Sequence, residues 1–365
     1  MNKEIISSTQ GISMMALFIA GSTFALGTAA AAKQDIWLAI IIAILFSLIA
    51  VVIYAAILTE FPGKNLFEIL EYVFGSVIGK VISVLYIWYF FHLAALVLTN
   101  FGQFVNKLGM TDTPKVVIEC FFMFIVVLGV RQGIELLGKC SIVFLIMLLI
   151  TEFVSITFKI PIINLNHLKP FLYDGLKPVM NSAFATFSFP FAETIVFMVI
   201  FNGLRNKKSY YKVYIIGILI GGLAVLAASV FEMMVLGKVE YFKTYFPTYV
   251  AIGRIKFPGF IERIEASISV AILLGGFLKI SICLLACCKG ISNLFNINDY
   301  RFLVTIIAIL AIILSSIVYE NTMEMVEWAV NVYSYYALVF QVILPIIIFI
   351  IMKIRIGAKE IRGVK

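Results

Sequence analysis

Long apolar runs, separated by short polar or charged segments, account for most of the chain. Each run is close to the ~20 residues that an α-helix needs to cross the hydrocarbon core of a bilayer. An amphipathic helix of a soluble domain would instead alternate apolar and polar faces every three or four residues. The pattern predicts ten membrane-spanning helices, at residues 12–32, 36–58, 81–101, 116–130, 140–157, 179–201, 211–236, 266–288, 302–319 and 328–352.

The composition supports this prediction. Of the 365 residues, 62% are hydrophobic and only 13% are charged, and the mean hydropathy is +1.08. A soluble domain could not bury so much apolar surface. We therefore expect an all-α polytopic protein whose residues 1–365 form one integral domain in the lipid bilayer. The five cysteines lie in apolar runs without the paired spacing of a metal site, so we expect no metal and no cofactor.

The distribution of lysine and arginine predicts the orientation in the membrane. Basic residues gather in the connection 202–212 and in the tail after residue 352, whereas the connection around residues 320–327 is acidic. Because basic loops stay in the cytoplasm, both termini are expected there. The net charge of +8 is dispersed over connections on both faces, so it gives no indication of a nucleic-acid partner.

Two of the runs, the first and the sixth, contain mid-span residues that disfavour a continuous helix. They are Gly21, Ser22 and Thr23 in the first run, and Phe189, Pro190 and Phe191 in the sixth. A broken helix is tolerated in a bilayer only where the freed backbone groups face protein, a cavity or a ligand. Breaks in the first helix of each five-helix half predict a 5+5 inverted repeat, at about 9–158 and 178–353, with helices 1 and 6 broken at the midplane. Alternatively, Gly21 only permits close helix packing and Pro190 only kinks its helix.

Paired breaks predict a binding site. New helix N-termini near Thr23 and Ala192 would present free N–H donors, and the preceding half-helices would present free carbonyls. This mixture suits a zwitterionic amino acid. Glu193, in the first turn after the second break, is the candidate for binding a proton or an amine. The predicted substrate-binding residues are Gly21, Ser22, Thr23, Phe189, Pro190, Phe191 and Glu193.

Lys279 lies near the middle of the eighth span, where a charge disfavours insertion by about 2.5–3.5 kcal/mol. Together with Glu265, Ser269 and Gly276 it forms a stripe of small or polar residues, which we expect to face the protein interior. Two hypotheses stay open for Lys279, with Glu265 grouped with it as a structural or coupling residue. The ammonium either replaces the sodium ion of related transporters and holds helices one and eight together, or it belongs to a structural ion pair.

Three other glutamates, Glu119, Glu152 and Glu232, fall near predicted span ends, where solvation at the membrane interface is the expected explanation. No nucleotide-binding loop, metalloprotease motif or nucleophile elbow is present, and the chain has only two histidines. We expect no enzymatic activity and no catalytic residues.

Two neighbouring segments carry a family resemblance. Residues 60–66, EFPGKNL, and residues 74–80, FGSVIGK, resemble segments of the spore germination permeases, the B subunits of germinant receptors. Further matches lie along the chain at residues 21–23, 189–193, 246–248, 263–266 and 277–280. The resemblance covers nearly the whole chain. One departure concerns the first break, where this chain has Gly-Ser-Thr and many relatives have Gly-Thr-Gly.

The resemblance implies a fold of the amino acid, polyamine and organocation transporter superfamily. It also implies a place in the spore inner membrane, partner subunits of the A and C types, and sensing of a small nutrient, typically an amino acid. We therefore expect a germinant-receptor subunit that binds such a ligand between helices one, six and eight. The alternatives are an autonomous proton-coupled amino acid permease and a structural subunit with a vestigial pocket.

Overall fold

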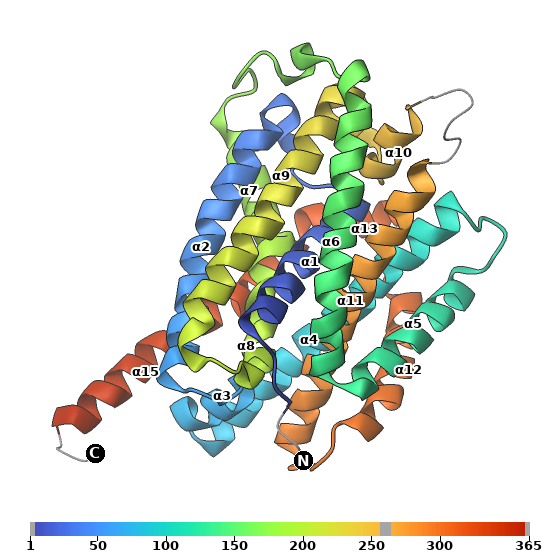
Figure 1. The fold of residues 1–365 in the computed structure, drawn as a ribbon. Coiled ribbons are helices and arrows are strands. Elements are labelled where there is room, and N and C mark those ends of the chain that lie inside the picture. Colours follow the sequence, from blue (N-terminus) through green and yellow to red (C-terminus); the bar gives the residue numbers. More distant parts are fainter. Residues whose placement is uncertain (1–3, 256–263, 362–365) are drawn as a thin grey trace.

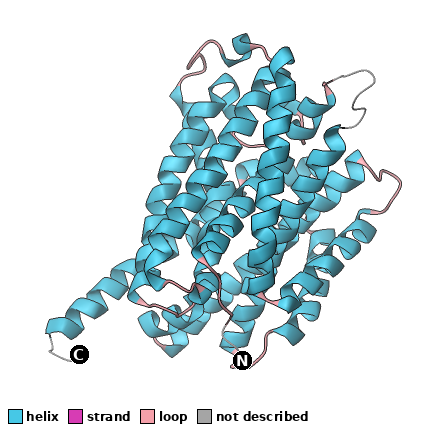
Figure 2. Cartoon of the chain, viewed as in Figure 1, coloured by secondary structure: helices cyan, strands magenta, loops and turns pink. Residues whose placement is uncertain are grey.

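The structure is a computed structural model that describes residues 4–255 and 264–361. Within these residues it is almost entirely helical, and Figure 2 shows no strand among them. Most helices run side by side along one direction, and the first and last described residues lie at the same end of the bundle (Figure 1). The prediction of an all-α protein is confirmed.

The helices follow the predicted runs closely. The first half contains α1 (Ser8–Leu26), α2 (Ile36–Glu60), α3 (Leu66–Phe74), α4 (Ser76–Leu108), α5 (Lys115–Gln132) and α6 (Ile134–Lys159). The second half contains α7 (Leu176–Thr186), α8 (Phe197–Ile200), α9 (Tyr210–Lys243), α10 (Pro247–Gly253), α11 (Ile264–Leu294), α12 (Arg301–Ile317), α13 (Thr322–Asn331), α14 (Tyr333–Leu338) and α15 (Leu344–Ile361).

Among the described residues, eight helices are long and apolar enough to cross a membrane, or nine if α12 and α13, which meet at a 98° bend, count as one span. Taken singly, α5 has 18 residues and α12 has 17, and both pack against α4. Added to the eight, these two helices make the arrangement consistent with the ten predicted spans.

The predicted break in the first span is wrong. Helix α1 continues without interruption through Gly21, Ser22 and Thr23 and ends at Leu26. Because the helix is continuous there, no free helix N-terminus begins at Thr23, whose hydroxyl donates to the Ile19 carbonyl at 2.8 Å. Glycine at position 21 instead permits close packing of α1 on α11, because a Cβ atom there would lie 2.5 Å from the Cα atom of Gly275 in α11.

The predicted break in the sixth span is confirmed. Between α7 and α8, Phe189 has φ −131° and ψ 117°, which are extended rather than helical angles. Pro190 follows and has no N–H to donate. The freed carbonyl of Ser188 accepts a hydrogen bond from the Gln341 side chain at 2.9 Å. The backbone that leaves the helix is therefore satisfied by another helix rather than by lipid.

The first and sixth spans form the centre of the bundle. In their most apolar windows, 78% of the α1 span and 83% of the span Leu176–Gly203 are buried, against 28% of the span that contains α6. Helix α1 packs against α6, α9 and α11. The two segments that the sequence singles out are thus among the most buried spans, together with the span Ala266–Leu294 in α11, which is also 78% buried.

Candidate ligand-binding site

A buried ion pair joins the two central spans to α11. The Lys279 ammonium of α11 pairs with the carboxylate of Glu193, which follows the break in the sixth span. The same ammonium donates to the Ser22 hydroxyl of α1 at 2.8 Å. Both charged side chains are fully buried. Lys279 therefore connects three helical segments that are far apart in the sequence.

Aromatic side chains enclose this ammonium. Its nitrogen lies 4.7 Å from the ring centroid of Phe18 and also 4.7 Å from that of Phe189. Such cation–π contacts contribute about 2 kcal/mol or more when the groups are desolvated. Because Phe18 precedes Ser22 by one helical turn, α1 supplies both a ring and a hydroxyl to Lys279.

Tyr333 completes the surroundings of Glu193. Its phenol, at the start of α14, donates to the second carboxylate oxygen of Glu193. A polar network lies beside it, where the Gln341 amide donates to the Tyr89 hydroxyl at 2.8 Å. The cluster of Ser22, Glu193, Lys279 and Tyr333 thus draws on α1, the sixth span, α11 and α14. We refer to these four residues as the central cluster.

The central cluster has a balanced charge. One ammonium and one carboxylate face each other, and hydroxyl donors or acceptors complete their shells. Burial of the pair is tolerated because its charges cancel and its hydrogen bonds are satisfied. A ligand that binds here must supply charges of both signs or leave the pair intact.

Three of the residues that the sequence selected belong to this cluster, Ser22, Glu193 and Lys279, and a fourth, Phe189, contacts the Lys279 ammonium through its ring. The other selected residues have different surroundings. Gly21 contacts Gly275, Thr23 bonds within its own helix, and Phe191 is directed towards Gly222 of α9. Pro190 is buried at the break. Glu265 belongs to the first turn of α11, but its side chain lies outside the described residues.

Sequence reasoning missed Phe18 and Tyr333. Phe18 has a usable signal, since it lies one turn from Ser22 on the same helix face. Tyr333 has none, because it lies 140 positions from Glu193 in the sequence and only the tertiary structure brings the two together. Glu193 is the partner that the ion-pair hypothesis for Lys279 requires. The same ammonium also joins α1 to α11, which are the first and eighth predicted spans.

The expectation that three other glutamates are solvated at the membrane interface is wrong. Glu119, Glu152 and Glu232 have exposed fractions of 0%, 3% and 1%. The reason for Glu119 is visible in its contacts: Lys115 lies at 3.6 Å and the Ser315 hydroxyl donates at 2.9 Å. For Glu119, its own helix and α12 therefore supply the polar groups that water was expected to supply.

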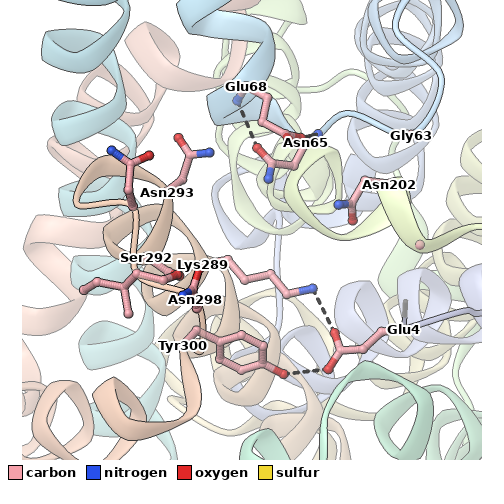
Figure 3. Close-up of a pocket in the computed structure, with 13 residues that line it drawn as sticks. Glu4, Gly63, Asn65, Glu68, Asn202, Lys289, Ser292, Asn293, Asn298 and Tyr300 are labelled. Carbon is pink, nitrogen blue, oxygen red and sulfur yellow. Dashed lines mark hydrogen bonds and ion pairs between the residues drawn. The ribbon is translucent and has the colours of Figure 1, made fainter. Parts of the chain in front are cut away.

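A polar pocket of about 490 Å³ is lined by side chains that include Glu4, Asn65, Lys289 and Tyr300 (Figure 3). In it Glu4 accepts a hydrogen bond from Tyr300 at 2.8 Å and forms an ion pair with Lys289 at 3.1 Å. Burial, and then the negative charge of Glu4, raise the pKa of Tyr300 well above its ordinary value, so its phenol keeps the proton that it donates. Next to Glu4, Ile6 is held by a backbone bond to Gly203 at 2.9 Å.

Replacing Glu4 with Ala is expected to loosen this N-terminal segment without unfolding the bundle. Partly exposed ion pairs contribute up to about 1 kcal/mol each, so opening of the segment should increase several-fold. Limited proteolysis of the purified chain measures it, with Asp174→Ala, which removes the Lys33 partner at the opposite end, as the matched control. Equal cleavage rates for both variants would show that Glu4 does not hold the segment.

The fold defines the class of protein. A nucleobase-cation-symport-1 family transporter, solved in a closed conformation with bromovinylhydantoin bound, superposes with a TM-score of 0.67 at 15% identity, covering 92% of this chain and 76% of that one. A mutant of the Eremococcus coleocola manganese transporter gives a TM-score of 0.62 at 13% identity, covering 93% and 77%. The chain therefore has a transporter fold.

The sequence comparisons define the family. Residues 5–324 match the family model described as "Spore germination protein". Spore germination protein KB of Bacillus subtilis is 30% identical over 355 residues, which are 96% of this chain and 95% of that protein. Spore germination protein YndE of the same organism is 24% identical, covering 88% of each chain. The chain belongs to the spore germination protein family, whose members are permease-like membrane proteins rather than enzymes.

Proposed function

We propose that this chain is the membrane-embedded subunit of a germinant receptor, which binds a small nutrient at the central cluster and thereby triggers germination. The family and the transporter fold support this proposal. The single observation that carries it is the convergence of the buried residues Ser22, Glu193, Lys279 and Tyr333 from the first, sixth, eighth and tenth spans.

An amino acid is the ligand class that suits the charges. Its carboxylate would take the place of Glu193 beside Lys279, and its ammonium would take the place of Lys279 beside Glu193. The buried charge then sums to zero before and after binding. A ligand with a net charge would leave one buried charge without a partner, which strongly disfavours binding.

The receptor role carries further proposals about partners and location. We propose assembly with A-type and C-type receptor subunits in the inner membrane of the spore, with both termini in the cytoplasm. The similarity to Spore germination protein KB supports this, as does the position of the first and last described residues at one end of the bundle (Figure 1). The basic residues in the connection 202–212 favour the cytoplasm for that end.

The alternative is an autonomous proton-coupled amino acid permease. One observation favours it: the Glu193 carboxylate lies between an ammonium and a phenol, so a proton could exchange there as the pair opens. The same cluster would serve both functions. They differ in whether the ligand completes the crossing and whether partner subunits are required.

Binding and uptake of labelled amino acids by the purified chain in liposomes test the proposal, with and without an imposed proton gradient. Saturable binding without accumulation is expected for a receptor, whereas gradient-driven accumulation by the chain alone would establish a permease. Glu193→Gln is expected to abolish binding. Glu119→Gln, a buried glutamate elsewhere, is the matched control and should bind normally. Absence of binding by the wild-type chain would contradict the ligand site.

Tyr333→Phe is expected to weaken amino acid binding about tenfold or more. The substitution removes one hydrogen bond to a charged carboxylate, which contributes about 1.5–3 kcal/mol. Equilibrium binding in the same liposomes measures the effect. Tyr336→Phe is the control, because the Tyr336 hydroxyl contacts His92 at 3.2 Å rather than the cluster. Equal affinities for the two variants would exclude Tyr333 from the site.

A further inference from the structure

A second group of buried ionisable residues lies between α6 and α9, apart from the central cluster. Glu152, Ser155 and Lys159 follow one another at helical spacing and share one face of α6. Glu232 of α9 and Thr248 of α10 join them. All five side chains are at least 97% buried. The ends of α6 and α9 and the short helix α10 gather at the end of the bundle opposite the termini (Figure 1).

These residues are poorly partnered. Both carboxylate oxygens of Glu152, the Ser155 hydroxyl and the Lys159 ammonium have no hydrogen-bond partner among the described residues. Glu232 accepts a hydrogen bond from the Thr248 hydroxyl at 2.5 Å. Lys159 interacts electrostatically with both carboxylates, and the two carboxylates interact with each other, but no ion pair within 4.0 Å joins them in the described part of the chain.

The charges of this group do not cancel. Two carboxylates face one ammonium, so the fully ionised group has a net charge of −1. The central cluster and the pair of Lys115 with Glu119 each contain one charge of each sign. An uncompensated buried charge is strongly disfavoured in a low-dielectric interior. The group therefore needs one additional positive charge.

Within residues 4–255 and 266–356, whose side chains the structure describes, the neighbouring elements do not supply this charge. Helix α1, which packs against both α6 and α9, contains no ionisable residue. The nearby ionisable groups have other partners. Arg254 pairs with Glu240, and Lys33 pairs with Asp174. Tyr241 donates to the Thr28 carbonyl, His167 bonds the Met234 carbonyl, and Asp35 accepts from the Leu172 N–H. Since no described side chain provides it, the missing charge is left to a bound ion.

We propose that the group of Glu152, Lys159 and Glu232 is a cation site that holds one monovalent positive charge, with a proton as the ligand that the geometry favours. A proton needs only one carboxylate oxygen, and unpartnered oxygens of Glu152 are available for it. An alkali cation would need several oxygens converging on one point, and among the described residues no group of three or more His, Cys, Asp or Glu side chains could hold a metal ion. This site does not depend on the ligand proposed for the central cluster.

Infrared spectroscopy of the purified chain tests the site through the C=O stretching band of protonated carboxylic acids. Glu152→Gln and Glu232→Gln are each expected to lose one protonated carboxyl per chain, because the remaining carboxylate then balances Lys159. Lys159→Met is expected to gain one, because two carboxylates then lack a cation. Glu119→Gln, which already has a lysine partner, should leave the band unchanged.

Two further arms separate the sources of the charge. The band is measured for the wild type and for Glu193→Gln in a large organic cation, and again after Na⁺ or K⁺ replaces that cation at constant ionic strength. If the replacement removes the band from the wild type but not from Glu193→Gln, the central cluster is involved and the proposal fails. If either ion removes it in both, an alkali cation occupies the proposed site. The proposal is also overturned if the wild type and both glutamine variants show the same band and no response to Na⁺ or K⁺.

Discussion

Lys279→Met is expected to reduce the amount of folded protein in the membrane strongly and to abolish the ligand response. The substitution leaves the Glu193 carboxylate fully buried without its ammonium partner. Breaking one side of a buried ion pair destabilises a protein by about 3–5 kcal/mol. That is a large part of the total stability of a typical domain. Membrane abundance and thermal stability in detergent measure the first effect, and ligand binding measures the second.

A double variant separates the effect of an unpaired buried charge on stability from the effect on ligand binding. Lys279→Met combined with Glu193→Gln removes both charges together, so abundance should recover to near the wild-type level. Ligand binding should stay absent, because neither charge is left to pair with the ligand. Lys33→Met, which removes a partly exposed ion pair, is the control and should have little effect. Normal abundance of Lys279→Met alone would show that the buried ammonium is dispensable.

Gly21→Val is expected to lower the abundance of the chain as well as its ligand response. If Gly21 only formed the binding-site break that the sequence predicts, a valine here would block the response and leave abundance intact. The structure instead places Gly21 against the backbone of Gly275 in α11, where a Cβ atom would lie 2.5 Å from a Cα atom. A backbone neighbour cannot rotate away, so the helices must separate, at about 1–3 kcal/mol or more.

The packing explanation makes a reciprocal prediction. Gly275→Val should have the same effect, because its Cβ atom would lie 2.4 Å from the Cα atom of Gly21. Gly253→Val is the matched control, since no atom lies within 4 Å of a Cβ atom at that position. Fluorescence-detected size-exclusion chromatography of the three variants measures abundance and monodispersity. Wild-type behaviour of Gly21→Val would contradict a close contact between α1 and α11.

Separation of α1 from α11 would also disturb the central cluster, because Ser22 follows Gly21 directly and bonds Lys279 of α11 at 2.8 Å. The loss of response in Gly21→Val is thus a consequence of packing rather than of a missing helix break. Both predictions concern one interface: glycines bring the backbones of the two helices together, and the ammonium then joins them through a hydroxyl.

The two breaks illustrate what a local pattern can predict. Pro190 has no N–H and cannot continue a helix normally, so its break follows from covalent structure. Gly21 permits a break but does not require one, because glycine also serves close helix packing. Only the facing residue decides between these uses, and that residue, Gly275, lies in a distant span.

The sequence by itself determined that this protein is an all-α membrane protein, where most of its spans lie, and that Glu193 and Lys279 belong to its interior. These properties depend on hydrophobic length and on the free energy of placing a charge in lipid, which are local quantities. The partners of those charges were decided by the tertiary structure alone. Ser22, Glu193, Lys279 and Tyr333 meet because four segments pack around one point, and burial of Glu119, Glu152 and Glu232 likewise depends on which helices lie beside them.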